Sequence, residues 1–252
     1  MSTLFDLTGT LAVVTGASRG IGFGMAEALA RAGADVIGVS ATIASHGSDV
    51  GRMVESYGRS FEARAVDFAD RSAVLTLGEE LAARAPDILV NNAGAIERAP
   101  AVDHPLAAWD RILEIDLSSQ FALTQAVARP MLERGRGKVI FTASLLSFQG
   151  GITVPGYAAA KSGIAGLTKA LANEWAVRGV NVNAIAPGYI ATDNTAALRG
   201  DPDRSRSILE RIPAGRWGEA SDLAGATVFL ASAASDYVHG IVLPVDGGWL
   251  GR

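Results

Sequence analysis

Short apolar runs alternate with longer segments of helical periodicity, and this alternation constrains the fold more than any other feature of the sequence. Strands are expected at residues 11–15, 35–39, 61–66, 87–90, 138–142, 181–185 and 241–245. Helices are expected at 20–32, 49–57, 71–84, in one long segment from 109 to 133, at 156–178, and in pieces between 192 and 231. Strands linked by helical crossovers form a parallel sheet with helices on both faces. The sequence therefore predicts a doubly wound α/β fold in a single domain, residues 1–252.

Composition excludes several classes of protein. The chain has no cysteine, which excludes disulfides and thiolate catalysis and fits a reducing compartment. A net charge of −4, with acids and bases mixed, disfavours nucleic acid as a partner. The N-terminus has no basic, then apolar, signal-peptide pattern, and no run of about 18 apolar residues predicts a membrane span. We therefore expect a cytoplasmic protein. The three histidines are scattered without ligand spacing, so no metal site is expected.

A glycine-rich segment, TGASRGIG, follows the first expected strand and leads into the first expected helix. Gly16, Gly20 and Gly22 permit backbone conformations closed to other residues and let a ligand approach the chain. The N–H groups that begin a helix then face a phosphate, aided by the helix dipole. The spacing differs from G-x-G-x-x-G, and a tight turn without a ligand is the alternative. Its place at the first strand–helix junction favours a dinucleotide site.

A tyrosine and a lysine predict the chemistry. Tyr157 and Lys161 are four positions apart on an expected helix and so share one face. Alcohol oxidation needs a group that accepts the hydroxyl proton, and a nearby ammonium favours the phenolate form of a tyrosine. Ser144, just past the strand at 138–142, can hydrogen-bond the reacting oxygen. Such tyrosine–lysine pairs also arise by chance on surface helices. The combination indicates a nicotinamide-dependent oxidoreductase that interconverts a secondary alcohol and a ketone.

With NNAG at 91–94 and PGYIAT at 187–192, these motifs make the chain resemble the short-chain dehydrogenase/reductase family over nearly its whole length. The resemblance implies a Rossmann-type parallel sheet of about seven strands and a homotetramer. Stretches such as SFQGG, RIPAGRWG and VDGGW are most similar to members that act on sugar acids. The implied substrates are 2-deoxy-D-gluconate, 2-dehydro-3-deoxy-D-gluconate or gluconate.

The motifs and the resemblance together define a predicted cofactor site. Its residues are Gly16, Ser18, Arg19, Gly20, Ile21, Gly22, Ser40, Asp67, Asn91, Ala93, Gly94, Tyr157, Lys161, Pro187, Gly188, Ile190 and Thr192. NAD-binding proteins of this type usually read the ribose 2′-hydroxyl with an acid at the end of the second strand. That strand ends Ser40-Ala41-Thr42, without an acid. Arg19 and Ser40 could bind a 2′-phosphate instead, so NADP is favoured over NAD.

One position departs from the family. The resemblance places an asparagine, which holds a water on a proton relay through the lysine, where this chain has Asp116. Aspartate accepts the same hydrogen bonds but cannot donate them. We expect Asp116 to substitute for that asparagine and to complete a catalytic set with Ser144, Tyr157 and Lys161.

A sugar acid requires a cation for its carboxylate and short polar groups for its hydroxyls. Arg98, Gln149, Tyr189 and Asn194 all follow predicted site segments and are expected to bind substrate. Arg98 is favoured for the carboxylate, with Arg211 and Arg216 as alternatives. The charged segment 199–211 is either a lid over the site or an ordinary surface helix.

Two other functions remain open. The chain could reduce carrier-protein-bound 3-oxoacyl groups, with Arg129, Arg134 and Arg136 as a basic docking surface, although a solvated helix end also explains these charges. It could also be a nucleotide-binding scaffold that has lost the chemistry. The intact Ser144, Tyr157 and Lys161 disfavour the scaffold, and Asp116 is its only support.

Overall fold

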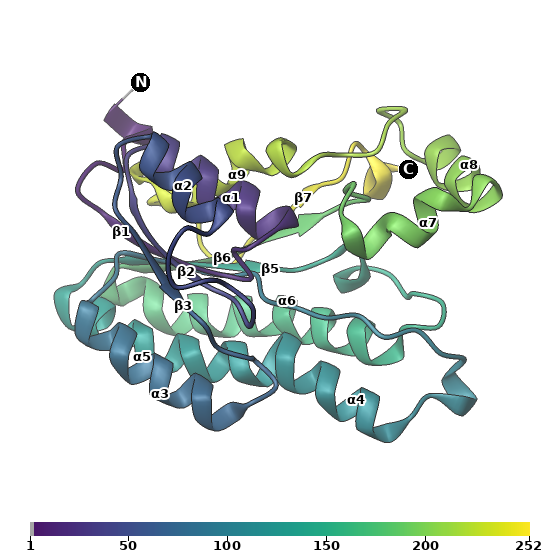
Figure 1. Ribbon diagram of the computed structural model, residues 1–252, viewed down its shortest axis with the longest axis horizontal. Coiled ribbons are helices and arrows are strands. Elements are labelled where there is room, and N and C mark those ends of the chain that lie inside the picture. Colours follow the sequence, from purple (N-terminus) through teal and green to yellow (C-terminus); the bar gives the residue numbers. More distant parts are fainter. Residues whose placement is uncertain (1–2) are drawn as a thin grey trace.

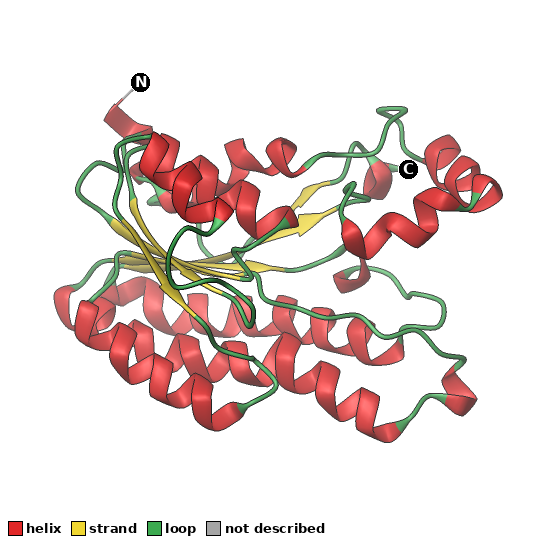
Figure 2. Cartoon of the chain, in the orientation of Figure 1, coloured by secondary structure: helices red, strands yellow, loops and turns green. Residues whose placement is uncertain are grey.

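A computed structural model, which describes residues 3–252, contains one seven-stranded sheet in the order β3-β2-β1-β4-β5-β6-β7 (Figures 1 and 2). Every pair of neighbouring strands is parallel. The strands are β1 (Leu11–Thr15), β2 (Asp35–Val39), β3 (Phe61–Arg64), β4 (Ile88–Asn91), β5 (Gly137–Thr142), β6 (Val180–Pro187) and β7 (Val242–Val245). The predicted Rossmann-type fold is confirmed, with strand ends within two residues of the expected ones.

Helices cover both faces of the sheet. They are α1 (Gly20–Arg31), α2 (Asp49–Ser56), α3 (Arg71–Arg84), α4 (Leu106–Leu113), α5 (Ser119–Arg134), α6 (Pro155–Trp175), α7 (Ala196–Gly200), α8 (Pro202–Arg211) and α9 (Ala224–Ala231). In Figure 1, α3 to α6 lie below the sheet and α1, α2 and α9 lie above it. Among the helices of residues 3–252, none is long and apolar enough to cross a membrane.

Alternate residues of the strands build two separate cores. Val13 and Ile37 pack in the cluster formed with α3, α5 and α6, whereas their neighbours Val14 and Val36 pack in the cluster formed with α1, α2 and α9. This follows from the two-residue period of a strand. Strands buried on both faces read as continuous apolar runs, which is why the sequence predicted them well.

The long helix expected at 109–133 is observed as a continuous helical run, but it is not α-helical throughout. It consists of α4, a π-helical turn at Glu114–Ser118, and then α5. A π-turn adds one residue to a helical turn and so changes which side chains face inward. Here the turn contains Asp116, whose side chain is fully buried. The π-helical turn therefore lies at a predicted site residue.

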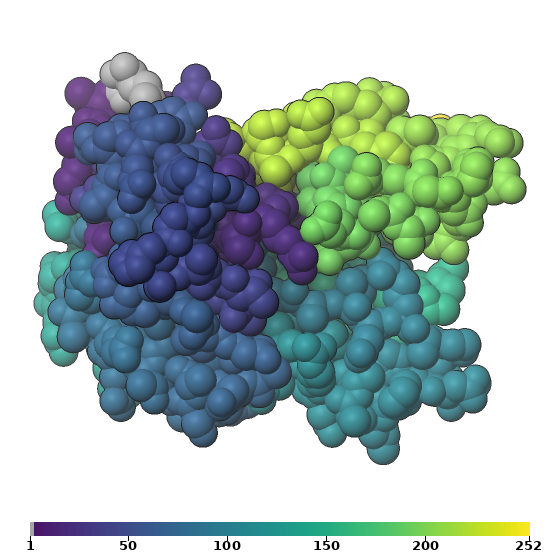
Figure 3. All heavy atoms as spheres, in the orientation of Figure 1, coloured from purple at the N-terminus to yellow at the C-terminus, as the bar shows by residue number. Residues whose placement is uncertain are grey.

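The segment α7–α8 lies beyond the sheet at one end of the molecule, where Figure 3 shows it above a hollow in the surface. Asp201 caps α8 by accepting hydrogen bonds from the N–H groups of Asp203 and Arg204, and Pro202 fits the first helical position. The segment rests on a third, small apolar core made of Leu145, Ile208, Ile212 and Trp249. The charged stretch 199–211 is thus a helix packed on its own core.

Candidate active site

A cavity of about 1050 Å³ opens at the carboxyl ends of the strands. Strand order reverses between β1 and β4, and open α/β sheets bind ligands outside the strand ends at such a point. All the residues predicted to bind cofactor or substrate, or to act in catalysis, line this cavity except Asn91. Residues of α8 and the C-terminal Trp249 line its outer part.

The glycine-rich loop has the geometry of an anion cradle. Gly16 and Gly20 have φ angles of +66° and +57°, which favour glycine. At Gly22 a Cβ atom would collide with the carbonyl oxygen of Gly16, so only glycine permits this turn. Helix α1 begins at Gly20, and its N-cap residue Arg19 makes no side-chain capping bond. The first N–H groups of α1 therefore remain available to a phosphate.

Hydrogen bonds join the glycine-rich loop to the NNAG segment. The hydroxyl of Thr15 accepts from the N–H groups of Asn92 and Ala93, each at 2.9 Å. The Asn92 side chain donates to the carbonyl oxygen of Thr15 at 3.0 Å. These bonds fix the ends of β1 and β4 against each other, so the two motifs form one wall of the cavity.

Asn91 does not face the cavity. It is the last residue of β4, and its fully buried side chain donates to the hydroxyl of Thr124 in α5 at 2.8 Å. Because side chains alternate along a strand, Asn92 faces the opposite way and lines the cavity. The NNAG segment therefore borders the cavity as predicted, through Asn92 and not through Asn91.

Lys161 is held at the bottom of the cavity. Its ammonium donates to the carbonyl oxygen of Thr142 at 3.0 Å and lies 3.3 Å from the carboxylate of Asp116. The same ammonium is 5.5 Å from the ring centre of Tyr157. The side chain is only 3% exposed, so two fixed oxygens define its position. The expected meeting of Tyr157 and Lys161 on one helix face is observed.

Asp116 is the buried counter-ion of Lys161. Its second carboxylate oxygen accepts from the N–H of Ala95 at 2.8 Å. Burial raises the pKa of Asp116, although the ammonium of Lys161 opposes this. Burial lowers the pKa of Lys161, but the charges of Asp116 and Tyr157 raise it by more than burial lowers it. The net shift of the pKa is therefore upward. Lys161 therefore keeps its positive charge beside Tyr157.

Ser144 and Tyr157 carry free hydroxyl groups into the cavity. The Ser144 hydroxyl accepts from the N–H of Leu146 at 3.2 Å and keeps its own proton to donate. Ser144 is itself fixed, because its N–H donates to the Ser147 hydroxyl at 3.3 Å. Within residues 3–252, the Tyr157 hydroxyl makes no hydrogen bond to another side chain or to the backbone. Both side chains line the cavity with a hydroxyl proton left to donate.

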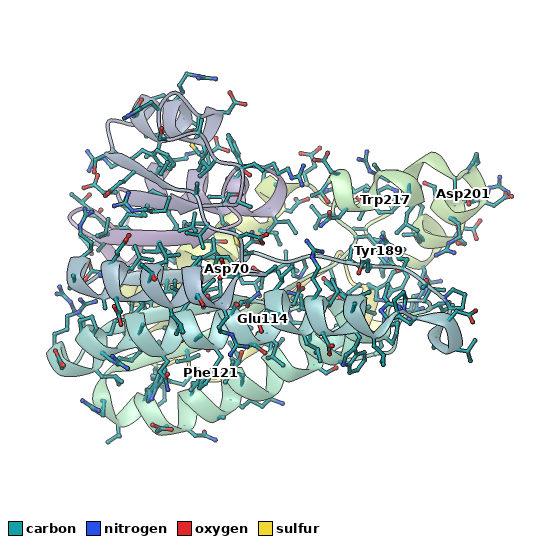
Figure 4. All side chains as sticks on the ribbon, turned by 60° about the horizontal axis from the view of Figure 1, so that its bottom comes forward. Asp70, Glu114, Phe121, Tyr189, Asp201 and Trp217 are labelled. Atoms are coloured by element: carbon teal, nitrogen blue, oxygen red, sulfur yellow. The ribbon has the colours of Figure 1, made fainter. Side chains whose placement is uncertain are left out.

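The outer part of the cavity is aromatic and cationic. Tyr189 packs edge-on against Trp217, with ring centres 5.6 Å apart (Figure 4). It also packs tilted against Trp249, with ring centres 4.7 Å apart. Arg211 lies over the Trp249 ring at 4.0 Å. Trp249 was not predicted as a site residue, because nothing in its local sequence places the C-terminus beside the cavity.

Two of the candidate cations differ in their surroundings. Arg216 forms a two-bond ion pair with Asp222, each bond 2.7 Å long, and does not line the cavity. Arg98 lines the cavity and is exposed, and within residues 3–252 it has no acidic partner; in particular, it does not pair with Glu97. Arg216 is therefore engaged elsewhere, while Arg98 is free to bind a ligand.

Comparison with known proteins assigns the family. A family profile described as enoyl-(acyl carrier protein) reductase matches residues 16–250. The chain is 58% identical over 250 residues to a 2-dehydro-3-deoxy-D-gluconate 5-dehydrogenase of Pseudoalteromonas atlantica, covering 98% of each chain. The chain belongs to the short-chain dehydrogenase/reductase family. The predicted resemblance is confirmed.

Solved structures of this family agree. A protein of Agrobacterium tumefaciens, provisionally described as a 2-deoxy-D-gluconate 3-dehydrogenase with bound NADP, matches with a TM-score of 0.94 and 52% identity over 100% of both chains. A gluconate 5-dehydrogenase of Burkholderia cenocepacia in complex with NADP and tartrate matches with a TM-score of 0.93 and 39% identity, over 99% of this chain and 98% of that one. This short-chain dehydrogenase is therefore an NAD(P)-dependent oxidoreductase acting on CH–OH groups.

Proposed function

We propose that the enzyme interconverts a secondary alcohol and a ketone on a sugar acid of the 2-dehydro-3-deoxy-D-gluconate type, with NADP as cofactor. The observation that carries the proposal is the fixed ammonium of Lys161 beside Tyr157, at the bottom of a cavity that is aromatic and cationic at its mouth. Relatives similar along the whole chain are named for this class of substrate.

Each residue of the catalytic set has a distinct task. Tyr157 takes the hydroxyl proton in oxidation and returns it in reduction, and Ser144 donates a hydrogen bond to the same oxygen. Lys161 stabilises the phenolate through its charge, and Asp116 fixes the position of the ammonium by accepting from it. The bound nicotinamide supplies the hydride transfer. Arg98, Gln149, Tyr189 and Asn194 contact the substrate at the mouth of the cavity.

The cavity fits a nicotinamide dinucleotide. The uncapped start of α1 and the glycine positions would hold the pyrophosphate. Asp67 would lie beside the adenine, and Thr192 would hold the nicotinamide amide, with Pro187, Gly188 and Ile190 on the same segment. Cofactor specificity depends on the end of β2, where Ser40 and Ser18 share a hydrogen bond of 2.9 Å and residues 40–42 include no acid. A carboxylate there would repel a 2′-phosphate, so its absence favours NADP.

Arg19→Ala tests whether Arg19 binds the 2′-phosphate of NADP. Arg19 is 78% exposed at its side chain and lies 3.5 Å from Asp193, an ion pair too exposed to hold it firmly. We expect it to turn to a 2′-phosphate. The substitution should lower kcat/KM for NADP about tenfold, as the loss of a charge-assisted bond implies, and leave NAD nearly unchanged. Equal losses with both cofactors would contradict this role.

Asp116→Asn tests whether Asp116 does the work of the asparagine that the family has at this position. The amide oxygen of asparagine can still accept from the N–H of Ala95, and Lys161 keeps its bond to Thr142. We expect kcat/KM to stay within about threefold of wild type, because residue 116 holds this part of the site as a hydrogen-bond acceptor rather than through its charge. A loss larger than tenfold, measured at the same pH with NADP saturating, would show that the carboxylate has a task of its own.

A substrate screen tests the function as a whole. Purified enzyme is assayed in both directions with NAD and NADP against sugar acids, the matching neutral polyols and a 3-oxoacyl thioester. We expect turnover of 2-dehydro-3-deoxy-D-gluconate or gluconate, with NADP preferred in kcat/KM. Preference for NAD would overturn the cofactor proposal, and activity confined to the thioester would overturn the substrate proposal.

The acyl-carrier alternative has less support. Arg134 donates to the carbonyl oxygens of Ala85 and Pro86, and Arg136 lies 3.4 Å from Asp87. These contacts tie the end of α5 to the segment before β4, at the edge of the sheet opposite the cavity. A carrier protein docked there would face the end of the sheet away from the cavity. The homotetramer, the cytoplasmic location and the single-domain assignment stay predictions.

A further inference from the structure

The guanidinium of Arg211 is held at the mouth of the cavity by two other parts of the chain. It stacks over the ring of Trp249, 4.0 Å from the ring centre, and donates to the side-chain oxygen of Gln149 at 3.5 Å. The same oxygen accepts from the indole N–H of Trp249 at 3.4 Å. Gln149 follows β5, Arg211 ends α8, and Trp249 belongs to the C-terminal turn. Three distant segments thus fix one cation.

This cation has unused donors. Nine arginines of the described chain pair with an acid, namely Arg19, Arg52, Arg64, Arg71, Arg84, Arg134, Arg136, Arg206 and Arg216. Arg211 has no such partner among residues 3–252, and its one side-chain acceptor is a neutral amide. A planar guanidinium with free donors is suited to a carboxylate, which it can bind through two parallel hydrogen bonds.

The charge of Arg211 reaches the substrate end of the cavity. Burial raises the pKa of Tyr189, and Arg211 opposes that rise, followed by Arg204. Tyr189 lies within the segment 187–192 that would cover the nicotinamide, so the positive charge of Arg211 also attracts an anionic substrate placed beside Tyr189. Arg98 lies on the opposite loop, is exposed, and has no side chain among residues 3–252 that fixes it in the cavity. A preorganised cation binds with less loss of side-chain entropy than a free one.

We propose that Arg211, stacked on Trp249 and bonded to Gln149, binds the substrate carboxylate and selects acids over neutral analogues. The proposal rests on the proposed function, since it assigns one group of that substrate to one residue. It replaces Arg98 with Arg211 as the main contact to the carboxylate. Arg98 is then left to contact hydroxyl groups.

The kinetic test compares 2-dehydro-3-deoxy-D-gluconate with its C1 amide, which has the same shape and no charge. Loss of one partner of a desolvated ion pair is costly, so Arg211→Ala should lower the acid-over-amide ratio of kcat/KM at least about 30-fold. Arg98→Ala should leave that ratio within about threefold of wild type. Arg206→Ala is the matched control, because Arg206 lies on the same helix, pairs with Asp203 and does not line the cavity. A ratio lowered by Arg98→Ala and not by Arg211→Ala overturns the proposal.

A binding measurement separates this proposal from the proposed function. D-gluconate is titrated into enzyme saturated with NADPH, a pair that cannot react, with D-glucitol as the neutral control. Arg211→Ala should weaken gluconate binding about 30-fold and leave NADPH binding unchanged. If wild type turns over no sugar acid but binds gluconate through Arg211, the proposed function fails and the carboxylate site stands. If gluconate binds wild type and Arg211→Ala equally, or binds neither, the carboxylate site is overturned.

Discussion

The Tyr157→Phe variant is expected to bind NADP as wild type does and to lose nearly all turnover. The ring stays on α6, and within the described chain the hydroxyl makes no hydrogen bond that the fold would miss. Only the proton carrier is removed, and general acid–base catalysis is worth about 10²–10⁴-fold in rate. Fluorescence titration of NADPH and steady-state kcat on the same preparation check both parts.

Tyr237→Phe is the matched control for this prediction. It removes the same hydroxyl from a side chain that is fully exposed and does not line the cavity, so its kcat should equal that of wild type. If Tyr157→Phe keeps more than about a tenth of the wild-type rate, another group carries the proton.

Lys161→Met should abolish activity and also destabilise the fold, increasingly so as the pH rises. The substitution leaves the carboxylate of Asp116 buried without its cation, and breaking a buried ion pair in this way costs about 3–5 kcal/mol. Burial already raises the pKa of Asp116 above its ordinary value of 3.8, and the loss of Lys161 removes the main opposing charge. Only the hydrogen bond from the Ala95 N–H and the weaker effect of Arg111 then still lower that pKa.

The direction of the pH dependence follows from that raised pKa. A folded-state pKa above the unfolded value means that the folded variant binds the proton more tightly, so its stability is greatest in acid and falls as the pH rises through the folded pKa. In wild type, the raised pKa of Lys161 keeps the pair intact across neutral pH. Urea unfolding at about pH 5.5 and pH 8.5 should therefore show a free-energy gap between wild type and variant that widens with pH.

The double variant Asp116→Asn with Lys161→Met isolates the cause. Without the buried carboxylate, the widening of the gap with pH should disappear, while activity stays absent because no ammonium faces Tyr157. A gap of equal size at both pH values in the single variant would mean that lost packing, rather than the unpaired charge of Asp116, causes the destabilisation.

The parts of the site that the sequence predicted are those built from strand ends. Parallel strands place their carboxyl ends at one edge, so TGASRGIG, NNAG and Ser144 were expected to meet, and they do. The parts that it missed depend on finer geometry. Neighbouring side chains of a strand point to opposite faces of the sheet, so an error of one residue places the wrong side chain in the site. This is why the cavity is lined by Asn92 rather than Asn91.

The sequence did not predict the π-turn or the contact of Trp249 with the cavity, for two different physical reasons. One residue added to a helical turn barely disturbs the apolar periodicity around Asp116, so 109–133 resembles a continuous helix. Trp249 reaches the cavity only because the chain after β7 folds back beneath α8, a long-range contact that no local pattern encodes.

Because α8 packs on its own small core, the α7–α8 segment tolerates amino-acid substitutions that the sheet does not. The residues proposed to bind the cofactor follow strands anchored in the two large cores, so substitutions there disturb the sheet. The α7–α8 segment contacts a separate cluster that includes Ile208 and Trp249, and the C-terminal Arg252 donates to the carbonyl oxygen of Glu210 at 2.8 Å. Substitutions in this segment can accumulate without loosening the sheet. The same scaffold can thus diverge toward new substrates by exchanging one peripheral helix pair, while the tail that braces it must diverge together with it.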